Sequence, residues 1–289
     1  MASAPVLTPR AAQLHAELAR APDPQAGGAW SRFSRGLGYP FTGWRFVRAH
    51  PELRPYCVIP IVLNFVIVTT ITVLLYHYYP DLIGLIWKKP DSVWLRILWH
   101  IMYVFMIGAG VVVGFLLFYL LQGLLAAPFN DLLSERTERI LAGHAPLPFS
   151  LKRFLRNLAV TVGHESLKFL MLGSILAALW LFCMIVLPGL GALVFSVLGG
   201  AVSAFFLGYD YHDYALSRRR FRFGAKWKLL RANTAMTLGF GTSVAAMLLV
   251  PILGLFFPPF AAVGGTILCL DYERFGRLPP PPAPPAPPA

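Results

Sequence analysis

The stretch from Tyr56 to Tyr79, YCVIPIVLNFVIVTTITVLLYHYY, decides the fold because none of its 24 residues is charged. As an α-helix it would extend for about 36 Å at 1.5 Å per residue, which is enough to cross a hydrocarbon core roughly 30 Å thick. An uncharged apolar stretch of this length is typical of a transmembrane helix. We therefore predict a full membrane span over residues 56–79.

A second uncharged stretch, from Ile97 to Ala127, contains 31 residues and ends directly before Pro128. Fully helical, it would measure about 46 Å, so it should tilt in the bilayer or protrude from it. Because proline cannot continue a helix without losing a hydrogen bond, we expect the helix to stop there. We predict a second full span over residues 97–127.

Two further uncharged runs each contain a break near their middle. Residues 169–209 are interrupted by Pro188, Gly189 and Gly191, and residues 232–270 by Pro251, Gly254, Pro258 and Pro259. Each run predicts a helical hairpin. The last arm of the second hairpin is only about eleven residues long, too short to cross. It favours a re-entrant hairpin whose irregular tip is shielded from lipid, whereas the first hairpin fits either kind.

The composition agrees with a membrane chain, because 57% of the residues are hydrophobic and only 13% are charged. Soluble domains carry about 25% charged residues. The three cysteines lie in or beside apolar runs, without a CxxC pair or histidines at ligand spacing, so neither a disulfide framework nor a metal site is indicated. The first long apolar run begins only after Pro55, which argues against a signal peptide. The predicted fold class is an all-α polytopic membrane protein.

The flanking segments differ from this membrane domain, which we place at residues 30–276. Residues 1–29 are rich in proline and alanine and predict a flexible tail that leaves room for a short helix around residues 11–20. Residues 277–289 predict a polyproline II tail. Residues 30–50 alternate aromatic and arginine side chains at helical spacing, as in a helix lying in the headgroup plane. Internal glycines and a proline are expected to break this helix into two short pieces.

The net charge of +12 admits two kinds of partner, nucleic acid or an anionic membrane surface. The cations flank apolar runs instead of forming a soluble domain, so the membrane is favoured and no nucleic acid is expected. Residues 210–231 hold seven cations against two acids, and residues 80–96 hold three against two. If each hairpin returns to its starting side, the more basic face includes the N-terminus and should be cytoplasmic.

Three local motifs now stand in order along the chain. They are HPELRPYCVIPIVLN at residues 50–64, AAPFNDLLSE at residues 126–135 and YDYHDYALSRR at residues 209–219. Together they resemble the CysZ-type sulfate permeases and their etoposide-induced relatives, over roughly residues 36–273. The positions that carry the second and third motifs are Pro128, Phe129, Asn130, Glu135, Asp210 and Asp213.

The resemblance implies a bacterial inner-membrane protein with two long spans, two partly penetrating hairpins and a homo-oligomeric assembly. It also implies uptake of sulfate or a similar anion, which would serve cysteine synthesis. The family binds sulfate near a Gly-Leu-Arg motif, whose last two positions match Leu53 and Arg54. This chain has Glu52 in place of the glycine and Pro55 in place of a frequent second basic residue. Both departures work against an anion, because one adds a negative charge and the other removes a donor.

Two candidate substrate contacts also have simpler interpretations. Arg54 is suited to charge-assisted hydrogen bonds with an oxyanion, but it could equally extend to lipid phosphate or pair with Glu52. Asn64 lies inside the first span, where its amide needs either another helix or a permeating ion as partner. Helix packing is the commoner outcome for such an amide.

The polar residues after Pro128 also leave two interpretations open. Asn130 or Asp131 is suited to cap a new helix, in which Glu135 would pair with Arg139 at i,i+4 spacing. The same residues could line a vestibule at the membrane surface. Carboxylates are poor anion ligands unless an arginine or a proton offsets their charge, so they are not assigned to the substrate.

No pattern typical of an enzyme is present, and no cofactor is indicated. The chain has no Gly-rich phosphate loop and no HExxH, which makes direct ATP use or metal-assisted hydrolysis unexpected. The leading hypothesis is a passive or ion-coupled permease for sulfate or a related oxyanion. The alternative is a non-transporting scaffold or lipid-handling protein on the same fold. Transport requires polar groups along a continuous water-filled path, whereas a scaffold lets those groups pair with one another.

Overall fold

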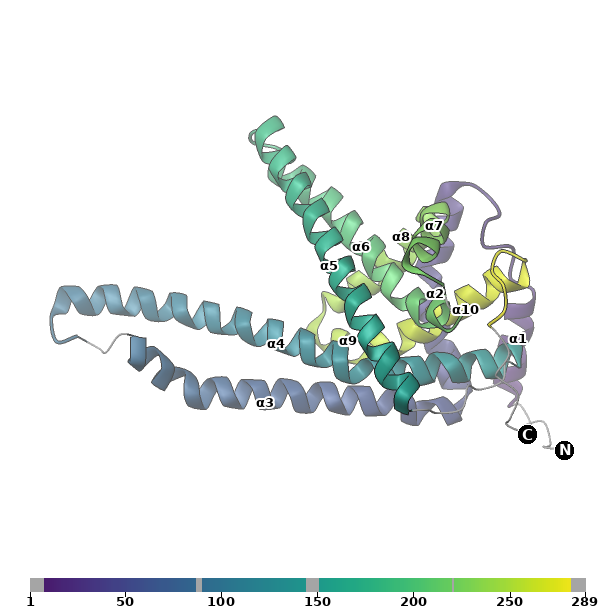
Figure 1. Ribbon diagram of the computed structural model, residues 1–289, viewed down its shortest axis with the longest axis horizontal. Helices are drawn as coiled ribbons and strands as arrows, with labels where there is room; N and C mark the ends of the chain where they lie inside the picture. Colours follow the sequence, from purple (N-terminus) through teal and green to yellow (C-terminus); the bar gives the residue numbers. More distant parts are fainter. Residues whose placement is uncertain (1–7, 87–89, 144–150, 220, 282–289) are drawn as a thin grey trace. The chain divides into compact units, whose positions relative to one another are not determined.

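The computed structural model describes residues 8–86, 90–143, 151–219 and 221–281, and every regular element in these ranges is a helix (Figure 1). Side chains at 80, 86, 115–116, 119–127, 151–165, 251 and 255 are outside this description. Four of the described helices are long and apolar enough to cross a membrane. The chain is therefore an all-α polytopic membrane protein, as the sequence predicted. Most of the predicted polyproline tail, residues 282–289, lies outside the described residues.

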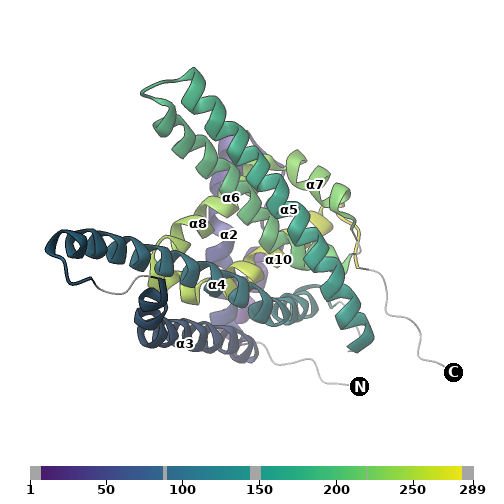
Figure 2. The ribbon, with the colours of Figure 1, turned by 60° about the vertical axis from the view of Figure 1, so that its left-hand side comes forward.

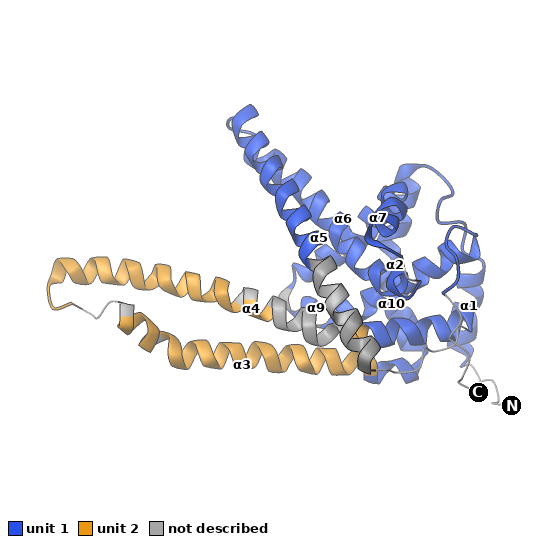
Figure 3. Ribbon diagram, viewed as in Figure 1, with its two compact units in different colours: residues 1–55, 131–289 blue, residues 56–130 orange. Residues whose placement is uncertain are grey.

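The chain divides into two compact units (Figure 3). Unit 2, residues 56–130, contains most of α3 (Arg54–Ile86) and the first part of α4 (Val93–Ala142). These two helices run antiparallel, and the ring of Tyr79 packs where a side chain at Gly110 would stand. Most other apolar side chains of this unit face outward; Phe65, for example, is 66% exposed. Such a surface needs lipid around it.

The α4 helix corrects one prediction, because it continues through Pro128 to Ala142 without stopping. Asn130 and Asp131 therefore lie inside a helix and do not cap a new one. A helix tolerates an internal proline where neighbouring groups compensate for the lost hydrogen bond. The predicted ion pair between Glu135 and Arg139 is confirmed, with 3.6 Å between nitrogen and oxygen.

Unit 1 combines residues 1–55 with residues 131–289 and is built around α2 (Ala29–Ala49). The expected break in this helix is wrong, because α2 is continuous and includes Pro40. Its glycines serve close packing. A side chain at Gly36 would collide with the backbone of α8 (Thr234–Leu248), and one at Gly43 with the backbone of α10 (Pro258–Arg274). The backbones thus approach closely, as small residues allow in membrane bundles.

The two hairpins of unit 1 differ in length and burial (Figure 2). The first joins α5 (Leu151–Val186) to α6 (Gly191–Arg218) through a turn at Gly189, whose φ of +86° favours glycine. Both of its arms are long enough to cross. The second consists of α8, the short α9 (Pro251–Phe256) and α10. Most residues of α10 are buried, whereas the tip of this hairpin is exposed: Leu249 is 83% and Ile252 is 69% exposed. The described residues of the chain do not shield the tip as a re-entrant hairpin requires, so the re-entrant form stays a prediction.

The N-terminal segment is more ordered than its composition suggests. Residues 9–19 form α1, capped by the Thr8 side chain, and Ala11 and Leu14 are buried. Glu17 of α1 pairs with Arg45 of α2 at 2.6 Å. The sequence favoured a flexible tail with room for a short helix around residues 11–20, and this part of the tail is a packed helix. The remaining proposed domain limits stay predictions.

Candidate functional site

The end of α4 carries a polar stripe that begins the site. Asp131, Ser134 and Glu138 stand at i, i+3 and i+7, a spacing that places them on one face of a helix. The side chain of Glu138 is only 3% exposed. A carboxylate so deeply buried requires charged partners.

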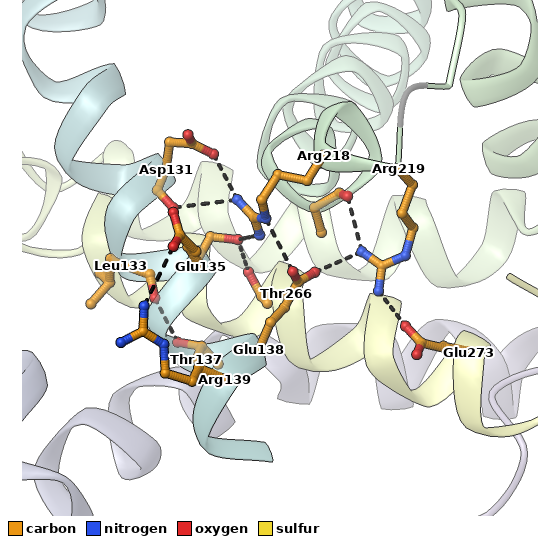
Figure 4. Close-up of polar contacts among 12 residues, drawn as sticks. Asp131, Leu133, Glu135, Thr137, Glu138, Arg139, Arg218, Arg219, Thr266 and Glu273 are labelled. Carbon is orange, nitrogen blue, oxygen red and sulfur yellow. Dashed lines mark hydrogen bonds and ion pairs between the residues drawn. The ribbon is translucent and has the colours of Figure 1, made fainter. Parts of the chain in front are cut away.

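The first partner is Arg218 at the end of α6, whose guanidinium spans the stripe (Figure 4). Its Nη1 lies 2.6 Å from Asp131 Oδ1, and its Nε donates to Glu138 Oε2 at 3.0 Å. Its Nη2 donates to Ser134 Oγ at 2.5 Å. All three nitrogens of this guanidinium are therefore engaged by one face of α4.

The second partner is Arg219, whose side chain is fully buried. Its Nη1 lies 2.6 Å from Glu138 Oε1, and its Nη2 pairs with Glu273 of α10. Its Nε and Nη1 also donate to the backbone carbonyls of Pro279 and Ala215. This arginine thereby joins α4, α6 and α10.

A hydroxyl pair adds a further connection between α4 and α10. Ser134 Oγ lies 2.5 Å from Thr266 Oγ1, which donates to the carbonyl of Ala262. Both hydroxyls are fully buried, and both are satisfied. We call Asp131, Ser134, Glu138, Arg218, Arg219, Thr266 and Glu273 the ion cluster.

Both arginines of the ion cluster are neutralised by carboxylates within it. Burial alone would raise the pKa of Glu138, but Arg218 and Arg219 outweigh it and hold that pKa below its ordinary value. Three carboxylates face two arginines whose donors are already engaged. An added anion would have to displace a carboxylate from a buried guanidinium, at high cost. The cluster therefore fits a helix-joining role better than an anion site.

The aspartates of the third motif are paired as well. Lys168 Nζ lies 2.5 Å from Asp210 Oδ1, and Lys226 Nζ lies 2.5 Å from Asp213 Oδ1. Ser217 donates to Asp213 and accepts from Lys226. The candidate residues Asp210 and Asp213 thus neutralise buried lysines.

The turn before α3 presents a different arginine. Leu53, at the end of the 3₁₀ turn η1 (Pro51–Leu53), is fully buried, while Arg54 is exposed and begins α3. Arg54 Nη2 donates to the carbonyl of Arg48 at 3.1 Å. Among the residues that the structure describes, Arg54 has no carboxylate partner, and Glu52 forms no ion pair with a cation. This guanidinium is oriented yet keeps donors for an anion.

Two histidines contact each other, one directly before this turn in the sequence and one in α1. His50, which is 3% exposed, places Nδ1 2.9 Å from the carbonyl of Phe46 and Nε2 3.1 Å from Nε2 of His15 in α1. A carbonyl accepts only from a protonated nitrogen, so His50 Nδ1 donates and its Nε2 accepts from His15. The contact requires a proton on His15 Nε2 and a free lone pair on His50 Nε2. Burial and then the neighbouring His50 lower the pKa of His15.

The remaining candidates lie on α3 and α4. Asn64 of α3 is 2% exposed and Asn130 of α4 is 4% exposed, and both belong to unit 2. Pro128 and Phe129 are half-buried in α4. Glu135 is engaged by Arg139. The structure joins the second and third motifs through the ion cluster; the predicted Asp210 and Asp213 are not among its members.

Sequence reasoning missed the centre of the ion cluster. It counted the cations of residues 210–231 together as one basic face, but Arg218 and Arg219 are buried, whereas Arg222 is exposed. The signal was present in the polar spacing of Asp131, Ser134 and Glu138. The part of the chain that the structure describes contains no group of three or more potential metal ligands, and its cysteines are buried and free.

Comparison with known proteins identifies a family over most of the chain. Residues 39–259 match the family described as sulfate transporter CysZ/etoposide-induced protein 2.4. A protein of Pectobacterium atrosepticum named sulfate transporter CysZ is 28% identical over 239 residues, which cover 83% of this chain and 86% of the relative.

Two further relatives carry the same name. The one from Vibrio parahaemolyticus is 29% identical, covering 81% of this chain and 93% of its own length. The one from Salmonella paratyphi A is 26% identical, covering 83% and 93%. These are names of transporters, in agreement with the expectation that the chain is not an enzyme.

Proposed function

We propose that this chain, which belongs to the sulfate transporter CysZ/etoposide-induced protein 2.4 family, is a permease for sulfate or a related oxyanion in the bacterial inner membrane. The observation that carries the proposal is the family match over residues 39–259, together with relatives named as sulfate transporters. The four candidate spans supply the membrane domain that such an activity needs. A homo-oligomer with a cytoplasmic N-terminus completes the proposal.

Arg54 is the proposed anion ligand. It combines exposure, an anchored side chain and the lack of a carboxylate partner in the described residues. A guanidinium of this kind forms short charge-assisted hydrogen bonds with tetrahedral oxyanions. Leu53, directly before Arg54, is buried in the same turn. Asn64, which belongs to unit 2, is proposed as a separate polar contact. The arginines of the ion cluster are not proposed as ligands, because their donors are already engaged.

The test is uptake of radiolabelled sulfate into proteoliposomes. Wild type, Arg54→Ala, Arg54→Lys and empty vesicles are compared, with Arg10→Ala as a matched control because Arg10 is also exposed and unpaired in the described residues. We expect wild type and Arg10→Ala to exceed empty vesicles, and Arg54→Ala to lose most of that uptake. Arg54→Lys should recover part of it, because lysine keeps the charge but not the planar fork of donors. Wild-type flux no greater than leak, from correctly folded protein, would refute sulfate transport.

The same vesicles separate passive from ion-coupled transport. Uptake is measured with a sulfate gradient alone and then with an added proton or sodium gradient. A passive permease responds only to the sulfate gradient, whereas a coupled one accumulates sulfate against it. The family relation does not decide between these modes.

A non-transporting scaffold is the second candidate, and one observation favours it. The charged groups of the ion cluster pair with one another, which is what a scaffold predicts. Retained folding and assembly without sulfate flux, in wild type and Arg54→Ala alike, would support this alternative.

A further inference from the structure

Helix α7 (Phe223–Ala232) has one face committed to the protein interior. It follows α6, a candidate span, and precedes the apolar α8, so it stands at the membrane boundary by connectivity. Phe223 and Trp227 pack against the core formed by Phe205, Phe206, Tyr209 and Leu230. The apolar face of α7 is therefore covered by its own unit and is not available for insertion into acyl chains.

One cation of α7 belongs to this inner face and is neutralised there. Lys226 is 2% exposed and contacts Asp213 and Ser217 at 2.5 and 2.7 Å. It anchors α7 to the end of α6. The one buried lysine of α7 is therefore paired with a carboxylate.

The outer face carries cations without such partners. Arg222, Lys228 and Arg231 are exposed and form no ion pair among the residues that the structure describes. At 3.6 residues per turn Lys228 and Arg231 fall on one half of the helix, and Lys226, Trp227 and Leu230 fall on the other. Arg222 is the N-cap residue directly before the helix. The sequence contains no acidic residue from position 214 to position 270, so the segment offers these cations no carboxylate.

We propose that the outer face of α7 is a docking surface for the headgroups of anionic phospholipids. The phosphate of a lipid headgroup supplies a negative charge for these cations at the membrane surface, where α6 ends and α7 begins. Three cations spread over α7 and its N-cap residue match a plane of headgroups better than a single small dianion, which requires donors that converge on one point. The outer face of α7 would attach this part of the chain to the membrane surface by charge, while the apolar face of α7 attaches the helix to the core of its own unit by packing.

The test measures lipid binding by the full chain in neutral detergent micelles. Dioctanoyl phosphatidylglycerol is titrated against wild type and against the triple variant Arg222→Gln, Lys228→Gln, Arg231→Gln, and the thermal unfolding midpoint is followed. Dioctanoyl phosphatidylcholine serves as the uncharged-surface control. A matched triple variant, Arg10→Gln, Arg20→Gln, Arg96→Gln, removes the same charge from exposed arginines elsewhere.

We expect phosphatidylglycerol, but not phosphatidylcholine, to raise the midpoint of wild type and of the matched variant. A cation near an anionic surface contributes about fivefold in affinity, so the α7 triple variant should bind on the order of a hundredfold more weakly. Raising the salt from 50 to 500 mM should weaken wild-type binding and leave the α7 variant little changed.

Two results would overturn the proposal. One is equal phosphatidylglycerol binding by wild type and the α7 variant. The other is displacement of the lipid by sulfate at equal concentration, which would make the surface a collector of free anions. If the triple variant does not fold, Lys228→Gln alone must still show its fivefold share. No readout depends on sulfate uptake, so this proposal and the permease proposal fail independently.

Discussion

Arg218 and Arg219 at the end of α6 and Arg54 at the start of α3 are chemically identical side chains in opposite situations. The first two are buried and each contacts two carboxylates. Arg54 is exposed, and its one described hydrogen bond goes to a backbone carbonyl. Burial explains the difference, because a buried guanidinium must be paired whereas an exposed one is solvated. Positive charge alone therefore does not distinguish a candidate anion ligand from a structural arginine in this chain; the difference lies in whether the donors of the guanidinium are engaged by the protein.

The ion cluster gives the largest expected effect. Replacing Glu138 by alanine, Glu138→Ala, leaves two buried arginines without their shared partner and should lower the free energy of unfolding by about 3–5 kcal/mol. The control is Glu135→Ala, whose half-exposed ion pair with Arg139 is worth about 0.5 kcal/mol. Thermal or denaturant unfolding in detergent measures both. Similar small losses in the two variants would show that Glu138 does not hold the cluster together.

The membrane fold was accessible from sequence because hydrophobic length is a local property. Residues 56–79 and 97–127 contain no charge, and a helix is the only simple way to satisfy their backbone in lipid. The two broken hairpins followed from proline and glycine in the same manner. Local rules overstated breaks where packing compensates, as at Pro128 in α4 and Pro40 in α2, both of which lie inside continuous helices.

The ion cluster was less accessible because it depends on contacts between distant segments. Glu138 meets Arg219 across 81 positions, and Arg219 meets Glu273 across 54. No spacing rule connects such residues, and the cations of residues 210–231 are alike in sequence. The polar spacing along α4 was a local clue to one side of the contact only. Burial, which sorts Arg218 from Arg222, appears only when the helices are packed.

On acidification, the attachment of α1 should weaken at a higher pH than the ion cluster does. Below about 6.5 the unfolded chain gains a proton on His15 that burial, and then the neighbouring His50, disfavour in the folded chain, so the attachment of α1 weakens as pH falls. Glu138 has a lowered pKa, so its contribution is full above 4.5 and is lost as pH falls through the folded-state value. A spin label at Gln13→Cys should become more mobile as the pH falls below 6.5, while the unfolding midpoint holds until lower pH.

The control for this pH series is His15→Gln, which removes the titrating ring from α1. Its label mobility should no longer depend on pH between 7 and 5. Simultaneous loss of both regions at one pH would contradict the separation, because it would mean that α1 is held by the same groups as the cluster.

A smaller effect concerns the charge beside Arg54. Glu52→Gly introduces the glycine that the resemblance to the family implies at this position and removes an exposed negative charge from the turn. An exposed charge interaction is worth up to about 1 kcal/mol, so apparent sulfate affinity in the uptake assay should improve by no more than about fivefold. Glu52→Gln separates charge from backbone freedom, because it is neutral but not glycine. Unchanged affinity in both variants would place the anion away from this turn.

The smallest effect is on stability at Arg54 itself, and it makes the uptake test interpretable. Arg54→Ala removes one hydrogen bond to the carbonyl of Arg48, at an exposed position, so the free energy of unfolding should change by less than about 0.5 kcal/mol. Unfolding of this variant and of Glu138→Ala is measured side by side in one detergent. If Arg54→Ala is as unstable as Glu138→Ala, its loss of uptake reports a damaged fold and Arg54 belongs with the structural arginines. If it is stable and inactive, the contrast between engaged and unengaged guanidinium groups holds.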